Sequence, residues 1–265
     1  MTETYEIYAV KYAEHKGRRL SENFIGGDPH DTSGQLDFFV WAIVGRSRTI
    51  LVDTGFNHEV AAERNRQLTR LPREGLAMLG IDAGRIEDVV ITHLHYDHAG
   101  TLSDFGNARF HIQDEEVAYA TGRHMCHGVL RHPYHVDDVC TLVRKVYQDQ
   151  VVFHDGDEEI APGVSVHHIG GHAKGLMSVR VNTRRGAVVL ASDASHLYAN
   201  MEEKRPFPIV YNVGDMMEGW NRLFRLAESP RHVIPGHDPL VMRRYPAASR
   251  ELEGVVARLD AEPRD

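Results

Sequence analysis

Residues 93–98, with the sequence His-Leu-His-Tyr-Asp-His, constrain the fold and chemistry of this chain more than any other segment. They place three imidazoles and one carboxylate in a short stretch, and such polar groups must be hydrated, paired or metal-bound. The preceding residues 88–92 are short, apolar and β-branched, which predicts a buried strand. The cluster therefore follows the end of a buried strand, a usual place for ligand chemistry in layered α/β folds.

The spacing within this cluster indicates metal binding. His93 and His95 are two residues apart, so in an extended segment they point the same way and can hold one ion. Asp97 and His98 come after the strand has turned, so they are free to face a second ion. The sequence thus allows two cation sites around one short loop.

Composition narrows the class of protein. The chain has 265 residues and 42% hydrophobic content, enough for a large core, and we expect one domain over residues 1–265. A net charge of −8 argues against a nucleic-acid partner. No long apolar run predicts a membrane span, and we see no signal peptide. Only Cys126 and Cys140 are present, which favours a cytoplasmic location.

The pattern along the chain predicts two β-rich halves, each ending in helix, that close on one shared core. Residues 13–35 are rich in Gly, Asp, Pro and charge, which predicts a long loop, and residues 122–150 form a lid-like insertion with four histidines. We expect strands at 5–12, 38–44, 49–52, 88–92, 108–113, 151–154, 164–169, 178–181, 187–191 and 231–234, and helices at 59–68, 114–121, 214–228 and 246–259.

Three more residues of ligand type follow predicted strands. His172 comes after the strand at 164–169, Asp193 after 187–191, and His237 after 231–234. Glycine precedes both histidines, which allows a close turn. The same edge of the sheets can therefore gather seven candidate ligands: His93, His95, Asp97, His98, His172, Asp193 and His237.

These motifs resemble the metallo-β-lactamase superfamily. The HxHxDH motif is complete at 93–98, and the later His172, Asp193 and His237 match in order and context, as does the Asp53-Thr54-Gly55 turn. Within that superfamily the chain looks most like the N-acyl-homoserine lactonase (quorum-quenching lactonase) group. Segments that carry this likeness are 110–116, 192–195 and the early loop at 27–30.

The resemblance implies an α+β four-layer αββα sandwich with the metal site at the strand-end edge between the two sheets. It also implies two divalent ions, one held by His93, His95 and His172 and the other by Asp97, His98 and His237, with Asp193 as the bridge. Zn²⁺ is favoured, and Fe, Mn or Co stay open because no thiolate is in the set. We expect a small-molecule substrate with a cyclic ester or related carbonyl, and a homodimer.

The implied reaction is the opening of a lactone ring by a hydroxide that bridges ions about 3.5–4 Å apart. Asp97 is then a ligand that can also deliver a proton to the leaving oxygen. Such lactonases usually carry tyrosine three residues after the bridging aspartate, where this chain has His196. His196 keeps a hydrogen-bond donor with shorter reach, and it is a candidate to stabilise the oxyanion or to act as the acid.

Several alternatives stay open at this point. The same metal chemistry suits a cyclic amide, an ester or a thioester of the glyoxalase II kind, although only Arg243, Arg244 and Arg250 offer a basic patch near the C-terminus. A phosphodiesterase and a non-catalytic binding protein on the same scaffold are further candidates.

Some residues also carry two interpretations. Asp53 caps the turn before the helix at 59–68, orients a metal ligand as the resemblance implies, or does both. The cluster of lid histidines is either a third metal site or a polar lid: His124, His127, His132 and His135. Candidates for apolar substrate contact are Met125, Leu130, Tyr134, Phe207 and Tyr211, with the 23–34 loop as a second wall of the pocket.

Overall fold

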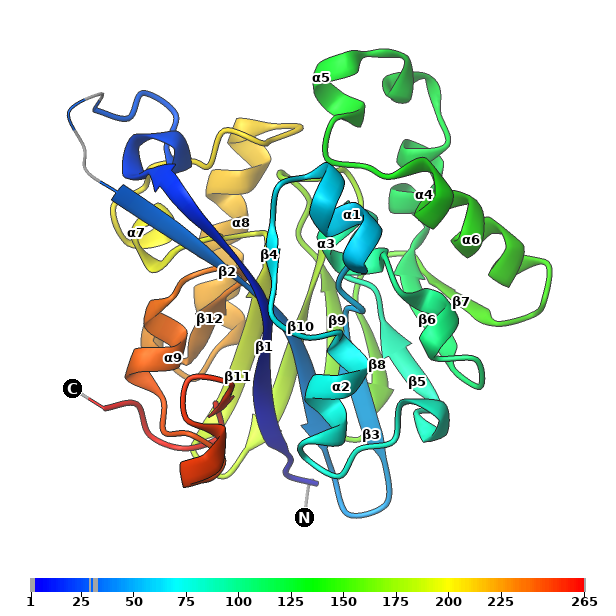
Figure 1. Ribbon diagram of the computed structural model, residues 1–265, viewed down its shortest axis with the longest axis vertical. Coiled ribbons are helices and arrows are strands. Elements are labelled where there is room, and N and C mark those ends of the chain that lie inside the picture. Colours follow the sequence, from blue (N-terminus) through cyan, green and yellow to red (C-terminus); the bar gives the residue numbers. More distant parts are fainter. Residues whose placement is uncertain (1–2, 29, 31–32, 265) are drawn as a thin grey trace.

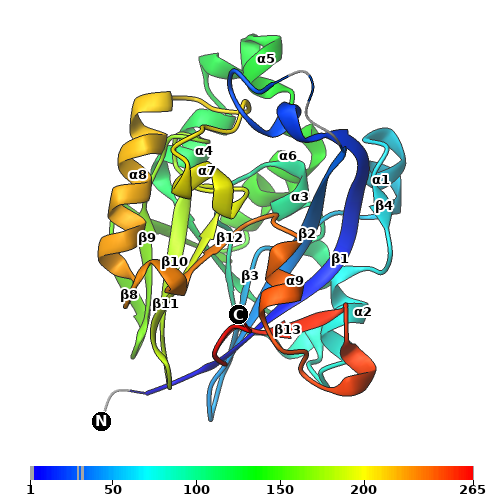
Figure 2. The same cartoon turned by 90° about the vertical axis from the view of Figure 1, so that its left-hand side faces the viewer.

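The computed structural model describes residues 3–28, 30 and 33–264, and two β-sheets form its centre (Figures 1 and 2). The first sheet has the order β13 (Val256–Arg258), β1 (Glu6–Arg19), β2 (Ser33–Val44), β3 (Thr49–Val52), β5 (Asp88–Val90), β6 (Arg109–Gln113) and β7 (Val151–His154), with β4 (Gln67–Leu68) paired to β1. The second has the order β12 (Val233–Pro235), β11 (Gly186–Ser192), β10 (Met177–Thr183), β9 (Val164–His168) and β8 (Glu158–Ala161).

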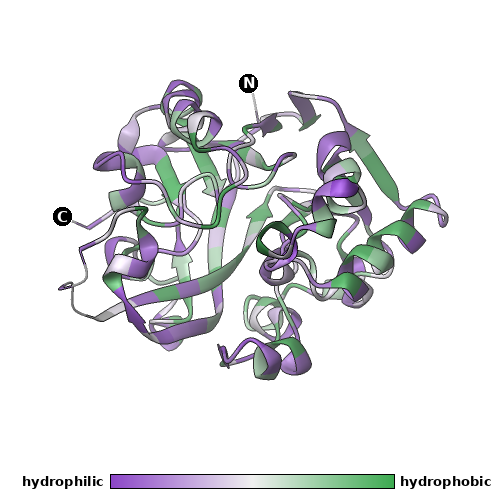
Figure 3. Cartoon of the chain, turned by 90° about the horizontal axis from the view of Figure 1, so that it is seen from above, coloured by the Kyte–Doolittle hydropathy of each residue, from purple (hydrophilic) through white to green (hydrophobic). Residues whose placement is uncertain are grey.

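Helices cover the outer faces of both sheets. On the first sheet they are α1 (His58–Glu63), α2 (Pro72–Ala77), α4 (Asp114–Ala120) and α6 (Val136–Val146), and α8 (Val213–Leu226) covers the second. Shorter helices are α3 (Tyr96–Ala99), α5 (Gly128–Arg131), α7 (Tyr198–Glu202) and α9 (Leu240–Arg244). In Figure 3, seen from above, hydrophilic residues are prominent on the helices and loops around the strands. The predicted four-layer αββα sandwich is confirmed.

Strand β2 shows why these layers form. Phe39 and Trp41 belong to the core between the sheets, whereas Phe38 and Val40 belong to the core under the outer helices. Successive side chains of a strand point to opposite faces, so a strand buried on both sides is apolar at every position. The uninterrupted apolar run at 38–44 therefore places this strand in the middle of the sandwich.

Strand direction brings the candidate ligands to one edge. Strand β5 runs parallel to both β3 and β6, and in the second sheet β11 runs parallel to β12. The carboxyl ends of parallel strands meet at the same edge of a sheet. The segments after β3, β5, β11 and β12 therefore lie close together, and they carry Asp53, the 93–98 motif, Asp193 and His237.

Three secondary-structure predictions were wrong. The predicted helix at 59–68 ends at Glu63, and Gln67–Leu68 is strand β4, which pairs with β1. The predicted helix at 246–259 is a 3-10 turn at Arg250–Leu252 followed by β13, because pairing of β13 with β1 overrides helical periodicity and Gly254 has a φ of +75°. The predicted 13–35 loop is shorter, since β1 continues to Arg19 along β2 and a 3-10 turn follows at Leu20–Asn23. Residues 29, 31 and 32 of that loop lie outside the described residues.

No helix in the described part of the chain combines the length and apolar character needed to cross a membrane.

Candidate metal centre and adjoining pocket

The seven predicted ligands converge at the strand-end edge, with Asp193 at their centre. Asp193 Oδ2 lies 3.1 Å from His172 Nε2 and 3.8 Å from His93 Nε2. Its other oxygen, Oδ1, lies 2.9 Å from His237 Nε2 and 3.3 Å from His98 Nε2. One carboxylate thus faces two separate sets of imidazoles, one with each oxygen.

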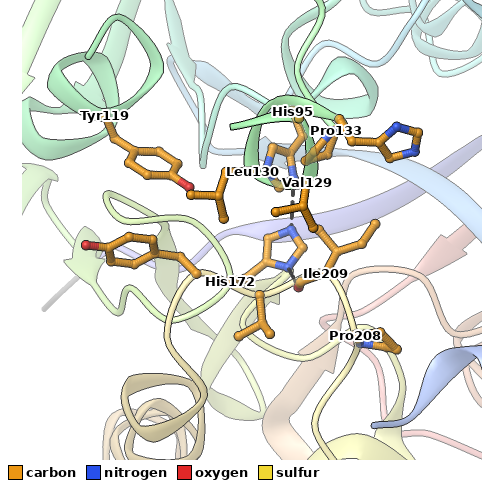
Figure 4. A pocket seen from close by; sticks show the side chains of 12 residues that line it. His95, Tyr119, Val129, Leu130, Pro133, His172, Pro208 and Ile209 are labelled. Carbon is orange, nitrogen blue, oxygen red and sulfur yellow. Dashed lines mark hydrogen bonds between the residues drawn. The ribbon is translucent and has the colours of Figure 1, made fainter. Parts of the chain in front are cut away.

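The remaining two predicted ligands complete these sets. His95 Nδ1 is 2.9 Å from His172 Nε2, a contact visible in Figure 4. Asp97 Oδ2 is 3.7 Å from His237 Nε2 and 3.8 Å from His98 Nε2. Groups with the spacing to hold an ion are therefore His93, His95, His172 and Asp193 on one side, and Asp97, His98 and His237 on the other.

Backbone carbonyls orient two of the histidines. His172 Nδ1 donates to the carbonyl of Ile209 at 2.7 Å, and His237 Nδ1 donates to the carbonyl of Asp37 at 2.9 Å. A proton fixed on Nδ1 leaves a lone pair on Nε2, the atom that faces Asp193. These carbonyls lie far from the ligands in sequence and carry no side-chain signal, so sequence reasoning missed them.

Asp53 orients a third histidine. Its Oδ2 accepts from His98 Nδ1 at 2.7 Å, and its two oxygens accept from the amide and hydroxyl of Thr92 at 2.8 and 2.9 Å. The residue has a φ of +62°, which turns its carboxylate toward the motif. The helix-capping alternative is wrong, because Asn57 caps α1 by accepting from the amide of Val60.

Asp53→Asn tests this orientation. The amide has one acceptor oxygen, so it serves either the Thr92 amide at the Oδ1 position or the Thr92 hydroxyl and His98 Nδ1 at the Oδ2 position. The negative charge that favours a proton on His98 Nδ1 is lost in either case, and affinity for a divalent ion is expected to fall about 10–100-fold. Competition with a chromophoric chelator measures this affinity. Asp82→Asn, which alters an exposed turn, is the matched control and should leave it unchanged. Equal affinity in both variants would show that Asp53 does not orient His98 for metal binding.

The donor atoms fit a divalent cation. His93 Nε2 and His98 Nε2 are buried and lack a hydrogen-bond partner, an arrangement that costs free energy unless something else satisfies them. Burial lowers the pKa of His93 and of His95 well below the usual value, which leaves the neutral imidazole that binds metal. Burial raises the pKa of Asp193, but the histidines around it hold that pKa well below its usual value.

His196 lies beside this cluster and is fully buried. Its Nε2 is 3.0 Å from Asp193 Oδ2, and its ring stacks on Phe207 with centroids 3.5 Å apart and an interplanar angle of 5°. Burial, chiefly, lowers the pKa of His196 to about 3, so the imidazole is neutral at pH 7. Its Nδ1 has no partner, and a neutral ring can offer one N–H donor.

Glu116 supports the segment 93–98, a role that sequence reasoning missed. The side chain is fully buried on α4; its Oε1 accepts from the amide of Leu94 and the hydroxyl of Tyr134, both at 2.9 Å, and its Oε2 accepts from the amide of Gly175 at 3.0 Å. Gly175 must be glycine, since a Cβ there would lie 2.1 Å from the Glu116 amide. The carboxylate thus holds the segment between His93 and His95.

Glu116→Gln is expected to lower the free energy of unfolding by about 1–3 kcal/mol. An amide offers one acceptor oxygen where the carboxylate offers two. Either the Leu94 amide and the Tyr134 hydroxyl, or the Gly175 amide, then face the NH₂ of the glutamine and lose their acceptor. Urea unfolding measures the loss. The neighbouring Glu115→Gln weakens only partly exposed contacts with Lys174 and His168, so it should cost at most about 1 kcal/mol. Equal losses would refute the buried role.

A cavity of about 300 Å³ adjoins the first ligand set (Figure 4). His95 and His172 form its polar end, and its walls include Tyr119, Leu130, Ile209 and Tyr211. Leu130 and Tyr211 therefore line it as expected.

The other predicted contacts lie elsewhere. Tyr134 is buried with its ring 4.6 Å from that of His95, Phe207 backs His196, and Met125 packs against the core under the outer helices.

Two of the lid histidines contact other side chains. His124 packs against the rings of Tyr119 and Tyr211, and His135 pairs with Asp138 at 3.3 Å. The clusters found among the described residues that could hold an ion include none of the lid histidines.

Comparison with known proteins defines the family. The family model described as the metallo-beta-lactamase superfamily matches residues 37–240. The chain is 32% identical over 209 residues to N-acyl homoserine lactonase AiiB of Agrobacterium fabrum (strain C58 / ATCC 33970), covering 69% of this chain and 75% of the relative. An N-acyl homoserine lactonase of Bacillus sp is 28% identical over 194 residues, with 66% and 72% covered. The chain therefore belongs to the metallo-beta-lactamase superfamily.

Solved structures agree on the fold. A quorum-quenching N-acyl homoserine lactone lactonase superposes with a TM-score of 0.75 at 22% identity, covering 91% of this chain and 94% of that one. AidC, described as a dizinc quorum-quenching lactonase, gives 0.70 at 15% identity, with 90% and 89% covered. Both support the four-layer architecture, and the relatives bear out the lactonase-like resemblance.

Proposed function

We propose that this chain is a dinuclear metal-dependent hydrolase that opens a lactone ring. The observation that carries the proposal is Asp193, whose two oxygens each face a different set of buried imidazoles beside the cavity. The curated relatives named as N-acyl homoserine lactonases support the choice of a lactone.

In this proposal the first ion is held by His93, His95 and His172, the second by Asp97, His98 and His237, and Asp193 serves both. The nitrogen and oxygen donors suit Zn²⁺ best, with Fe, Mn or Co as other candidates. When bound, two such ions polarise a carbonyl and lower the pKa of a shared water toward neutrality.

His196 and Asp97 supply the hydrogen bond and the proton that the reaction needs. His196, whose Nε2 lies 3.0 Å from Asp193 Oδ2, would use the one N–H of its neutral ring to stabilise the oxyanion that develops on the substrate. Asp97 is only slightly accessible, and its carboxylate carries the proton that reaches the leaving alcohol. The tyrosine that similar lactonases carry is replaced, so the donor reaches less far into the pocket.

The side chains of the cavity wall indicate the size and polarity of the substrate. Leu130, Ile209 and Tyr211 favour an apolar group next to the reacting carbonyl, so a small molecule fits. We further propose that residues 1–265 work as one domain in which 122–150 is a lid-like insertion, since Leu130 and His132 of that insertion line the cavity.

A second candidate keeps the metal chemistry and changes the carbonyl. His196 in place of tyrosine favours this alternative, because an imidazole N–H and a tyrosine hydroxyl differ in reach and acidity and so suit different substrate carbonyls. An ester, a cyclic amide or a glyoxalase II-like thioester is then the substrate.

A substrate panel tests the proposal. Metal-loaded protein is assayed with a pH indicator against acyl-homoserine lactones, aromatic lactones, cyclic amides, S-lactoylglutathione and a phosphodiester. Lactones are expected to turn over fastest, chelation to abolish turnover, and added Zn²⁺, Mn²⁺ or Co²⁺ to restore it. Turnover confined to another class, or unaffected by chelation, would contradict it.

A further inference from the structure

Tyr119 points its hydroxyl into the cavity beside the candidate metal centre. The side chain comes from α4, and Figure 4 shows its hydroxyl directed toward Leu130 and His172, which line the same cavity. Tyr119 is only 3% exposed. In the part of the chain that the structure describes, the hydroxyl has no hydrogen-bond partner. A buried hydroxyl without a partner costs free energy until another molecule supplies one.

The neighbouring Tyr134 shows how the fold uses a tyrosine hydroxyl for support. Its ring centre lies 5.9 Å from that of Tyr119 and 4.6 Å from that of His95. Its hydroxyl donates to Glu116 Oε1 at 2.9 Å and so helps to hold the segment 93–98. The residues that line the cavity include Tyr119 but not Tyr134. Of these two hydroxyls, one is therefore used within the fold and the other faces the cavity.

The fold fixes the position of Tyr119 relative to the candidate ligands. Glu116, one helical turn earlier on α4, accepts from the amide of Leu94 in the segment 93–98. Residues three apart lie on the same side of a helix, so Tyr119 faces the same way as Glu116. The ring of Tyr119 also packs against Tyr211 and His124, with centres 5.0 and 5.2 Å away. The hydroxyl is thus in place before a substrate binds, which lowers the entropic cost of the contact.

The Tyr119 hydroxyl is a neutral donor. Burial, and then the charge of Glu116, raise the pKa of Tyr119 to about 12, so the hydroxyl keeps its proton at pH 7. Apolar residues such as Leu130 and Ile209 form the wall around it. A charged acceptor would lose its hydration in such surroundings, so a neutral carbonyl oxygen is the partner that suits this donor.

We propose that Tyr119 is a specificity-determining residue, whose hydroxyl donates a hydrogen bond to a neutral carbonyl in the side chain of the lactone substrate. This inference rests on the proposed function, in which the lactone ring lies at the end of the cavity formed by His95 and His172. The side chain of the substrate then extends along Leu130 and Ile209. The substrate class is therefore a lactone that carries an amide or ketone carbonyl in an otherwise apolar side chain.

Three lactones with side chains of equal length test the inference. They are α-heptyl-γ-butyrolactone, without a side-chain carbonyl, N-hexanoyl-homoserine lactone, with an amide, and N-(3-oxohexanoyl)-homoserine lactone, with an amide and a ketone. Tyr119→Phe removes the hydroxyl and keeps the ring contacts with Tyr134, Tyr211 and His124. Relative to the alkyl lactone, kcat/KM on at least one carbonyl lactone is expected to fall about 3–10-fold, mainly through KM, as for one neutral hydrogen bond.

Tyr147→Phe is the matched control, because it removes the same hydroxyl from a side chain that is 87% exposed, and it should leave the ratios of kcat/KM unchanged. Metal content and the thermal unfolding midpoint of Tyr119→Phe should match those of the wild type. Ratios in Tyr119→Phe equal to those of the wild type would overturn the inference. The same fall on all three lactones would also overturn it, because that result indicates a structural role.

Failure of the proposed function is distinguishable from failure of this inference. If the wild type opens none of the three lactones, the proposed function fails for them, and calorimetric titration with the three ring-opened acids then decides about Tyr119. A preference for a carbonyl-containing acid that is about 3–10-fold weaker in Tyr119→Phe than in the wild type supports the inference. An equal preference in both proteins, or no binding of any acid, refutes it.

Discussion

Replacing Asp193 by Asn is expected to abolish loading of the second metal ion and to reduce kcat/KM by more than about 100-fold, the upper range for residues that only orient ligands. The substitution preserves shape and removes the charge. Asp193 is within 4 Å of five histidines from both sets: His93, His98, His172, His196 and His237. Asp97, the other carboxylate of the described site, faces only His98 and His237. Metal analysis and lactone turnover on one preparation check both effects.

Gly236 packs closely against Asp193. A Cβ on Gly236 would lie 2.7 Å from Asp193 Oδ1, so no side chain larger than that of glycine fits beside this oxygen. The control is Asp215→Asn, which removes one charge from the exposed first turn of α8 and should keep both ions. Two tightly held ions and normal turnover in Asp193→Asn would show that the carboxylate does not join the sites.

His196→Ala is expected to lower kcat by about 10²–10³-fold, the usual effect of losing one donor to an oxyanion. KM and metal content should change little if the imidazole acts on the substrate. His196 also lies close enough to Asp193 and His237 to contact an ion, so metal content is the measurement that separates the two roles. Loss of an ion together with activity would make it a ligand. Unchanged rates on every lactone would remove it from the mechanism.

His196→Tyr is the complementary variant. A tyrosine ring can keep the stacking on Phe207 and carry its hydroxyl farther, as in similar lactonases. A gain of acyl-homoserine lactone turnover is expected, with a lower rate on the lactone that the wild type prefers. No change in the order of substrates would show that position 196 does not set substrate choice.

The sequence predicted which seven side chains would come together at the strand-end edge, because their signal is local. The polar motif follows one buried strand, and single candidate ligands follow three later strands. These residues come together because strands that run in the same direction end at the same edge of a sheet, a rule that holds for the fold class. Both sheets follow it here, and the seven side chains meet.

Long-range contacts account for what the sequence did not reveal. The Ile209 and Asp37 carbonyls orient His172 and His237 through backbone atoms, which leave no residue pattern. Glu116 looked like one acidic residue among three in the first turn of α4, and only its burial under Leu94 and Gly175 distinguishes it. The false helix at 246–259 arose because periodicity cannot foresee a strand that pairs with β1.

Titration of the metal-free protein with Zn²⁺, with lactone turnover followed at each addition, tests the central claim most directly. Two sets of ligands joined by Asp193 predict that turnover is absent without metal and saturates at two equivalents per chain. Saturation at one equivalent, or turnover by the metal-free protein, would contradict a dinuclear lactone hydrolase.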